Sequence, residues 1–166
     1  MENQQFTKAT IGAPEPWLIE AAAGISLNLA RFVHEITNQF EDHALNRHGD
    51  PAFHGAATIT AADFSRIPGI IKAPDMAIIG AKRKERLINV YVKAENGVTY
   101  LYFEEILQGR KNKALRGCTF YKVTRPLTVD DILKNVTRND KTDISGAKVY
   151  NPVIKKVQAV GGYPGG

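Results

Sequence analysis

Residues 87–106 read LINVYVKAENGVTYLYFEEI. Two runs rich in β-branched and aromatic residues flank Asn96-Gly97, the dipeptide most typical of a two-residue hairpin turn. Such a turn places Lys93 opposite Tyr100 in the facing strand. The stretch therefore predicts an antiparallel hairpin with strands over 87–93 and 98–106, and it makes a β-sheet the centre of the fold.

Alternation along the two strands divides their side chains between two faces. One face is apolar and is expected to lie on the core: Ile88, Val90, Val92, Leu101 and Phe103. The other face is aromatic, basic and polar: Asn89, Tyr91, Lys93, Tyr100, Tyr102 and Glu104. We expect this second face to be open to solvent, as a platform for stacking bases and binding phosphate. A solvated face without function is the alternative.

Helical patterns precede the hairpin. A short helix is predicted from Trp17 to Ala23. A longer amphipathic helix is predicted from Ser26 to His48, because apolar residues recur there at spacings of three and four. Its apolar positions are Leu29, Phe32, Val33, Ile36 and Phe40. Thr60 and Asp63 have the spacing of a capping box and predict a further helix over 61–65.

The rest of the chain adds elements on both sides of the hairpin. Strands are predicted over 75–80 and 117–124, a basic loop or short helix over 108–115, and a helix over 128–134 capped by Thr128. We predict one domain over 1–166, divided into a helical part (14–66), a sheet part (74–125), an extension (126–151) and a flexible tail (152–166).

Composition limits the classes of function. The chain has 166 residues, 43% of them apolar, which suffices for one domain with a core. Its net charge of +5 and pI of about 9.3 favour a polyanionic partner such as RNA, DNA or anionic lipid, with merely solvated lysines as the alternative. Its one cysteine, Cys118, excludes an internal disulfide and a Cys-rich zinc site. Neither a membrane-spanning run nor a signal peptide is visible.

The segment His43-Ala-Leu-Asn-Arg47-His48 closes the predicted long helix. A neutral histidine accepts a proton from a ribose 2′-OH, and a protonated one gives a proton to the leaving 5′-oxygen. His43 and His48 are therefore the candidate acid–base pair, and Arg47 is a candidate phosphate ligand. The alternative is structural: His43 would lie at the edge of the core, and His48 would cap the helix. Shared metal binding is disfavoured, because this spacing separates the two imidazoles by about 140° around a helix.

The strand at 117–124 carries the second set of candidates. We place Thr119 and Tyr121 on the open face, where their hydroxyls, with a lysine ammonium, would donate to the oxygens of a pentacoordinate phosphorane. Lys122 falls on the other face by alternation and is a candidate for substrate binding. The hairpin adds Tyr91, Lys93 and Tyr102 as candidates for substrate binding. The basic segments 82–84 and 110–113 are expected to contact the phosphate backbone, unless they are only solvated.

Seven short motifs follow one another along Ile11 to Val123. They are Trp17-Leu-Ile, His34-Glu-Ile, His43-x-x-x-x-His48-Gly-Asp, Ile59-Thr-x-x-Asp63-Phe, Ile67-Pro-x-Ile-Ile-x-x-Pro74-Asp, Glu104-Glu105…Gly109-Arg110 and Thr119-x-Tyr121-Lys122. The series resembles that of phage-associated nucleases of the barnase, EndoU, colicin and RelE-like superfamily. The segment from Arg125 to Asn151 lies outside the pattern.

This resemblance implies an α+β fold with N-terminal helices packed on a curved antiparallel β-sheet, and an active site on the open face. It also implies metal-independent RNA cleavage by transesterification, which leaves a 2′,3′-cyclic phosphate and needs no cofactor. The helix-borne histidine of the family corresponds to His43, with His48 beside it. Its basic residue corresponds to Lys93 or Arg110, and its strand hydroxyl corresponds to Thr119.

We therefore expect an endoribonuclease that serves as a toxin domain and is delivered by a phage or a secretion system. It would act on RNA, with tRNA among the candidates, in the cytoplasm of a target or host cell. A cognate immunity or inhibitor protein is the expected partner, and no membrane partner is expected. Three alternatives remain open: a non-catalytic nucleic-acid-binding or virion module on the same fold, a metal-dependent nuclease that acts on DNA, and an inactive relative whose surface serves recognition only.

Overall fold

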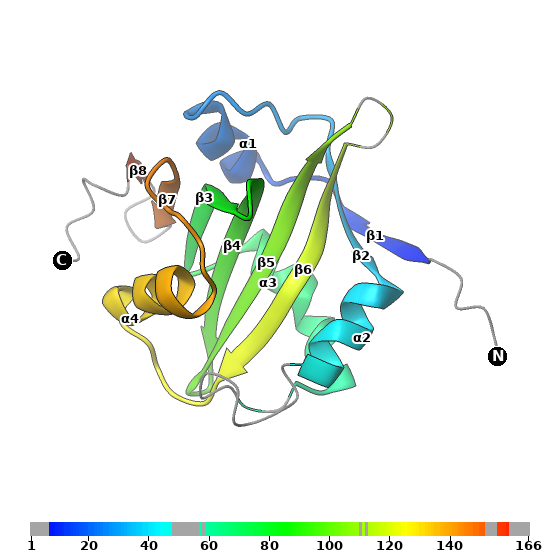
Figure 1. Ribbon diagram of the computed structural model, residues 1–166, viewed down its shortest axis with the longest axis vertical. Coiled ribbons are helices and arrows are strands. Elements are labelled where there is room, and N and C mark those ends of the chain that lie inside the picture. The colour runs from blue at the N-terminus through cyan, green and yellow to red at the C-terminus, as the bar shows by residue number, and fades with distance from the viewer. Residues whose placement is uncertain are drawn as a thin grey trace.

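The computed structural model describes residues 7–47, 57, 59–109, 111, 113–151 and 156–159. Within them, one curved sheet has the strand order β1-β2-β6-β5-β4-β3-β7-β8 (Figure 1). Its neighbours are antiparallel except for β2 and β6, which run parallel. The strands are β1 (Lys8–Gly12), β2 (Val33–Thr37), β3 (Met76–Arg83), β4 (Arg86–Glu95), β5 (Val98–Gln108), β6 (Lys113–Val123), β7 (Lys148–Asn151) and β8 (Lys156–Ala159).

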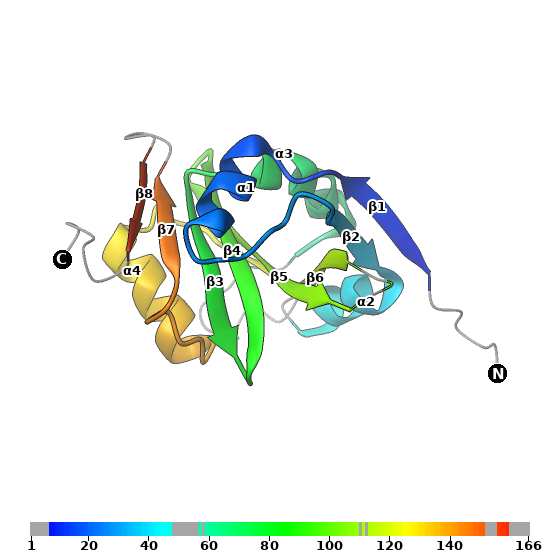
Figure 2. The same cartoon turned by 90° about the horizontal axis from the view of Figure 1, so that it is seen from above.

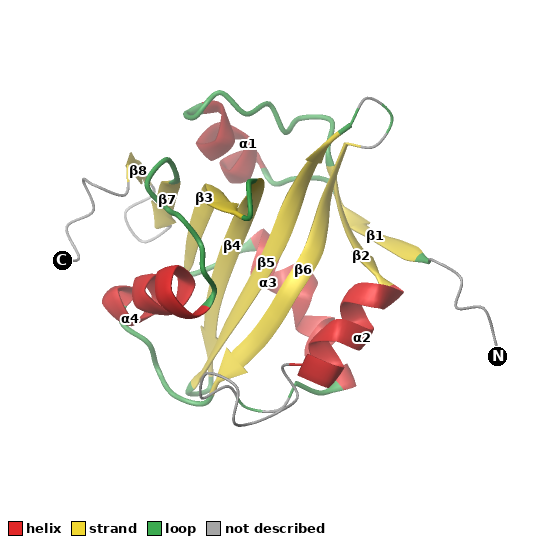
Figure 3. Cartoon of the chain, viewed as in Figure 1, coloured by secondary structure: helices red, strands yellow, loops and turns green. Residues whose placement is uncertain are grey.

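Helices cover both faces of this sheet, which makes the predicted α+β class correct. The first core takes residues from α1 (Pro16–Ala23), α2 (Asn38–Arg47) and α3 (Ile67–Lys72). The second core takes residues from α4 (Val129–Lys134) and from η3 (Asn135–Asn139), a π-helical turn that continues α4. Figure 2 shows α1 and α3 on one side of the sheet and α4 on the other. A 3-10 helix, η2 (Ala61–Arg66), leads into α3, and Figure 3 shows these helices beside the strands.

The hairpin that the sequence predicts is confirmed. Asn96 and Gly97 form its turn with φ angles of 52° and 78°, the left-handed values that a type I′ turn requires. Lys93 pairs with Tyr100 and Tyr91 with Tyr102. The alternation is also correct, because Val90 and Phe103 enter one core while Tyr91 and Tyr102 enter the other.

The predicted open face of the hairpin is wrong. Tyr91, Tyr102, Asn89 and Glu104 are each 0% exposed, because the N-terminal helices cover this aromatic face. The opposite, apolar face is covered only in part by α4 and η3, which belong to the extension after the sheet. Alternation separates two faces but does not say how many layers of helix will cover them.

The predicted long helix over 26–48 is also wrong. Residues 33–37 form β2, which pairs with β1 and β6, and only Asn38–Arg47 is helical. The segment VHEIT is rich in β-branched residues, which favour strands. Thr37 then caps the shorter helix, since its Oγ1 accepts a hydrogen bond from the Phe40 N–H at 3.1 Å.

Most of the remaining elements are confirmed. The helices predicted over 17–23, 61–65 and 128–134 are α1, η2 and α4, and both predicted capping boxes are present. The loop predicted over 108–115 is shorter, because β5 extends to Gln108 and β6 begins at Lys113. Within the predicted flexible tail, Lys156–Ala159 forms β8. The division of 1–166 into functional parts stays a prediction.

A polar cluster lies inside the first core. Glu104 accepts hydrogen bonds from Asn89 Nδ2 at 3.2 Å and from the Tyr91 hydroxyl, and it lies 2.8 Å from His34 Nδ1. His34 is 1% exposed and lies on β2 rather than on the predicted long helix. Neither His34 Nε2 nor the Tyr102 hydroxyl has a hydrogen-bond partner among the described residues.

Candidate active site

A cleft of about 580 Å³ opens on the face of the sheet that carries α4. Figure 1 shows α4 and α2 on either side of the front of β5 and β6. The cleft is lined by His43 from α2, by residues around the β3–β4 turn, by β5 and β6, and by the loop that follows η3. Its lining residues are His43, Arg83, Lys84, Arg86, Ile88, Glu105, Cys118, Thr119, Asn139, Asp140 and Lys141.

Arg83, the last residue of β3, organises the cleft floor. Its Nη2 donates to Thr119 Oγ1 at 3.0 Å and to Cys118 Sγ at 3.3 Å. Its guanidinium carbon also lies 5.2 Å from the centroid of the Phe103 ring. These contacts fix a planar cation, a geometry that suits bidentate recognition of phosphate.

Two exposed lysines at the cleft, Lys84 and Lys141, adopt left-handed backbone conformations. Their φ angles are 51° and 53°, values that carry a steric penalty for residues with a side chain. Lys84 belongs to the two-residue turn that sets Arg83 opposite Arg86 in the β3–β4 ladder. The positive φ angles of Lys84 and Glu85, 51° and 64°, are those that a two-residue type I′ turn requires, so the turn itself accounts for the conformation of Lys84.

The charge of the cleft is predominantly positive. Four cations line it (Arg83, Lys84, Arg86 and Lys141) against two carboxyl groups (Glu105 and Asp140), and His43 adds an imidazole. Arg86 Nη1 donates to both oxygens of Glu105, at 3.1 and 3.2 Å. An excess of fixed cations in one hollow attracts phosphate-bearing ligands.

Burial shifts the pKa of two groups at the cleft. The pKa of Asp140 is raised from 3.8 to about 6, because desolvation outweighs the hydrogen bond from the Tyr121 hydroxyl and the attraction of Arg83. The pKa of the Cys118 thiol is raised from 9.0 to about 11, again by desolvation. Cys118 is therefore a neutral wall of the cleft at pH 7, and Asp140 titrates close to neutrality.

Of the predicted catalytic residues, the structure brings His43 and Thr119 to this cleft. His43 is exposed on α2, and Thr119 is 5% exposed on β6. Tyr121 shares the face of Thr119, as predicted, but that face is not open there. Tyr121 is 2% exposed, and its hydroxyl donates to Asp140 Oδ2 at 2.8 Å. Tyr121 is therefore not part of the cleft lining, and it contacts the cleft residue Asp140 from within the core.

Four of the predicted substrate-binding residues are not in the lining of the cleft: Tyr91, Lys93, Tyr102 and Lys122. Lys93 Nζ donates to the Ala73 carbonyl at 2.8 Å, and Lys122 Nζ donates to Asp63 Oδ2 at 2.9 Å. Both lysines therefore contact the segment around η2 and α3, and their predicted contact with phosphate stays a prediction. Tyr91 and Tyr102 are buried in the first core. His48, Arg110 and the side chain of Arg47 lie outside the described residues.

The site contains residues that sequence reasoning did not single out. Arg83 and Lys84 were predicted only as part of the basic segment 82–84, which is expected to contact the phosphate backbone. The structure puts both residues at the cleft. Asn139, Asp140 and Lys141 carried no signal, since they come from the extension. Their place in the cleft follows from the packing of α4 and η3 on β3 and β6.

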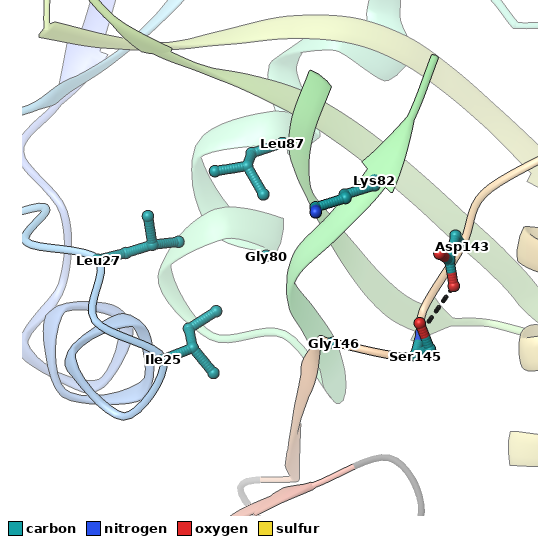
Figure 4. Close-up of a pocket in the computed structure, with 8 residues that line it drawn as sticks. All are labelled: Ile25, Leu27, Gly80, Lys82, Leu87, Asp143, Ser145 and Gly146. Atoms are coloured by element: carbon teal, nitrogen blue, oxygen red, sulfur yellow. Dashed lines mark hydrogen bonds between the residues drawn. The ribbon is translucent and has the colours of Figure 1, made fainter. Parts of the chain in front are cut away.

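A second, smaller cavity of about 280 Å³ lies near Ile25 and Leu27, beside β3. Figure 4 shows the Lys82 amine and the apolar side chains of Ile25, Leu27 and Leu87 around it. Asp143 accepts a hydrogen bond from the Ser145 N–H at 2.9 Å at its rim. The lining of this cavity includes one cationic side chain, Lys82, whereas the lining of the larger cleft includes four cationic side chains and a histidine.

Two further features of the described part of the chain concern metal ions and membranes. There, no group of three or more His, Cys, Asp or Glu side chains is placed to hold a metal ion. None of the described helices has both the length and the apolar character needed to cross a membrane.

An α+β fold with a cationic cleft that is lined by a histidine and a buried threonine hydroxyl has the charge that suits a phosphate-bearing substrate. The family model described as phage-Barnase-EndoU-ColicinE5/D-RelE like nuclease3 matches residues 14–128. The chain belongs to this family of phage-associated nucleases, as its motif series predicted. Searches of curated proteins and of solved structures returned no match. The family match ends at Thr128, so α4, η3 and the loop after them lie beyond it.

Proposed function

We propose that this nuclease is an endoribonuclease that cleaves RNA by transesterification, without a metal ion. One observation carries the proposal: His43, Thr119 and Arg83 line the same cationic cleft. The imidazole supplies proton transfer near pH 7. Arg83 and the Thr119 hydroxyl supply donors for the oxygens of the reacting phosphate.

In the proposed reaction the ribose 2′-oxygen attacks the adjacent phosphorus, and the 5′-oxygen leaves. His43 moves a proton on one side of this exchange. Arg83 stabilises the charge that develops on the phosphorane, and the cations at the rim hold the flanking phosphates. The nucleophile belongs to the substrate, so the chemistry selects RNA over DNA by its 2′-hydroxyl.

The test is incubation of the purified chain with an RNA oligonucleotide in excess chelator. We expect cleavage to persist, to leave a 2′,3′-cyclic phosphate, and to stop when the ribose at the cut carries a 2′-deoxy substitution. Cutting of DNA that the chelator abolishes would select a metal-dependent DNase instead. Binding of RNA without any cutting would select a non-catalytic module.

We further propose that the chain is a toxin domain that acts in the cytoplasm of a target or host cell, on RNA such as tRNA. A cognate inhibitor would place carboxylates over the four cleft cations, because opposite charges align such a complex. Induced expression of the wild-type chain in a bacterial cell is expected to stop growth and degrade RNA. Unchanged growth with an accumulating folded chain would contradict the toxin proposal.

A further inference from the structure

One wall of the cleft comes from residues that the family match does not reach. Asn139, the last residue of η3, lines the cleft together with Asp140 and Lys141, which follow it. Asp140 is the most buried of them, at 9% exposed, and the Tyr121 hydroxyl donates to its Oδ2 at 2.8 Å. Its backbone is held as well, since its N–H donates to the Asn135 carbonyl at 3.0 Å and its carbonyl accepts from Thr142 Oγ1 at 3.1 Å.

The carboxyl of Asp140 is surrounded by charged and titratable groups from several elements. Tyr121 on β6 and Arg83 on β3 both lower its pKa, and burial raises it further than they lower it. The other such groups at the cleft are His43, Lys84, Arg86, Glu105, Cys118 and Lys141. The result is a pKa of about 6, in the range where a carboxylate is an efficient base at neutral pH.

The second carboxyl group of the cleft is less suited to proton transfer. Both oxygens of Glu105 accept from Arg86 Nη1, at 3.1 and 3.2 Å. Both of its oxygens are therefore already engaged by a protein donor. The Tyr121 hydroxyl donates to Asp140 Oδ2, whereas no hydrogen bond to Oδ1 occurs among the described residues, so Oδ1 is the oxygen assigned to a substrate hydroxyl.

We propose that Asp140 is a proton-transfer residue of this enzyme, and that it works with His43 across the cleft; the proposal rests on the proposed ribonuclease function. The Asp140 carboxylate takes the proton of the ribose 2′-OH while the 2′-oxygen bonds to phosphorus. The bond from phosphorus to the 5′-oxygen breaks, and the His43 imidazolium protonates that oxygen. One bond to phosphorus forms as one breaks, and one proton is taken up as another is given, so no co-reactant is needed.

The first test compares Asp140→Asn with Asp130→Asn by measuring kcat/KM for RNA from pH 5 to pH 8.5. Wild-type activity is expected to fall as the pH drops through about 6. Asp140→Asn should lose this acid limb and lower the rate at pH 7.5 by about 10²-fold or more. Asp130 is an exposed carboxylate on α4 that pairs with Lys134, so its variant should match the wild type.

A second variant separates proton transfer from support of the fold. Tyr121→Phe removes the hydrogen bond that lowers the pKa of Asp140 and leaves the carboxyl in place. The acid limb should therefore move to higher pH, with activity retained on the alkaline side. A residue that only buttressed the cleft would change the rate without moving the limb.

Thermal unfolding gives a readout that does not depend on activity. Because the folded-state pKa of Asp140 is raised, its contribution to stability is full below pH 3.8 and is lost as the pH rises through about 6. The Tm of Asp140→Asn should therefore exceed that of the wild type at pH 8, and the difference should shrink toward pH 4. A folded variant at pH 8 also shows that lost activity is not lost structure.

The outcomes separate the two proposals. If Asp140→Asn keeps the wild-type rate and acid limb while the wild type cleaves RNA, Asp140 takes no part in proton transfer and the ribonuclease function stands. If the wild type cleaves no RNA at any pH, both proposals fail.

Discussion

Replacing His43 with alanine is expected to lower kcat/KM for RNA cleavage by about 10²–10⁴-fold, the usual contribution of one general acid or base. His43 is exposed on α2 and lines the cleft with Arg83 and Thr119. Its removal takes away proton transfer and leaves the phosphate-binding cations in place. Steady-state kinetics at pH 7 should therefore show a fall in kcat, with KM changed only a few-fold.

Asp42→Ala is the matched control for this variant. Asp42 is the exposed neighbour of His43 on the same helix and is not part of the cleft lining. Both variants should keep the wild-type Tm within a few degrees, because single changes at exposed positions have small effects on stability. If His43→Ala cleaved RNA at the wild-type rate, the imidazole would have no role in the reaction.

The partner of His43 can be decided by comparing variants. The histidine spacing predicts His48 as that partner, and this stays a prediction because His48 lies outside the described residues. The cleft offers Asp140 for the same role. Loss of the acid limb in Asp140→Asn but not in His48→Ala would assign the role to the carboxylate, and the reverse would assign it to the imidazole.

Patterns within a single segment predicted the local structure of this chain well. The Asn96-Gly97 turn, the Thr128 capping box and the two faces of the hairpin follow from residues close in sequence. The same reasoning selected His43 and Thr119, which the structure puts at one cleft. These signals need only the local geometry of turns, caps and strands.

What the patterns missed depends on contacts between distant segments. The cleft opens on the face predicted as core, where Ile88 lines it. An irregular register between Phe103 and Glu104 sets Cys118 beside Thr119 at the cleft, although alternation predicts them on opposite faces. The wall at Asn139–Lys141 depends on α4 docking against the sheet. No residue spacing within the extension predicts that α4 docks there.

The buried cluster around Glu104 leads to the largest expected effect on stability. Glu104→Ala should lower the free energy of unfolding by about 3–5 kcal/mol, as is usual when one partner of a buried charged network is removed. The change would remove the partner of His34 Nδ1 and the acceptor of the Tyr91 hydroxyl inside the first core, and it would leave Asn89 Nδ2 with only its 3.4 Å hydrogen bond to the Tyr91 hydroxyl. Each orphaned buried donor carries a desolvation cost that no protein contact offsets.

Two matched variants decide whether the orphaned donors are the cause. Glu105, the next residue, pairs at the surface with Arg86, whose side chain is 67% exposed, so Glu105→Ala should cost less than about 1 kcal/mol. Tyr102→Phe removes a buried hydroxyl without a partner among the described residues, so it should be neutral or stabilising. Urea unfolding at pH 7 measures all three variants, and their m-values should stay equal. Equal losses for Glu104→Ala and Glu105→Ala would show that the buried network contributes nothing beyond an ordinary surface pair.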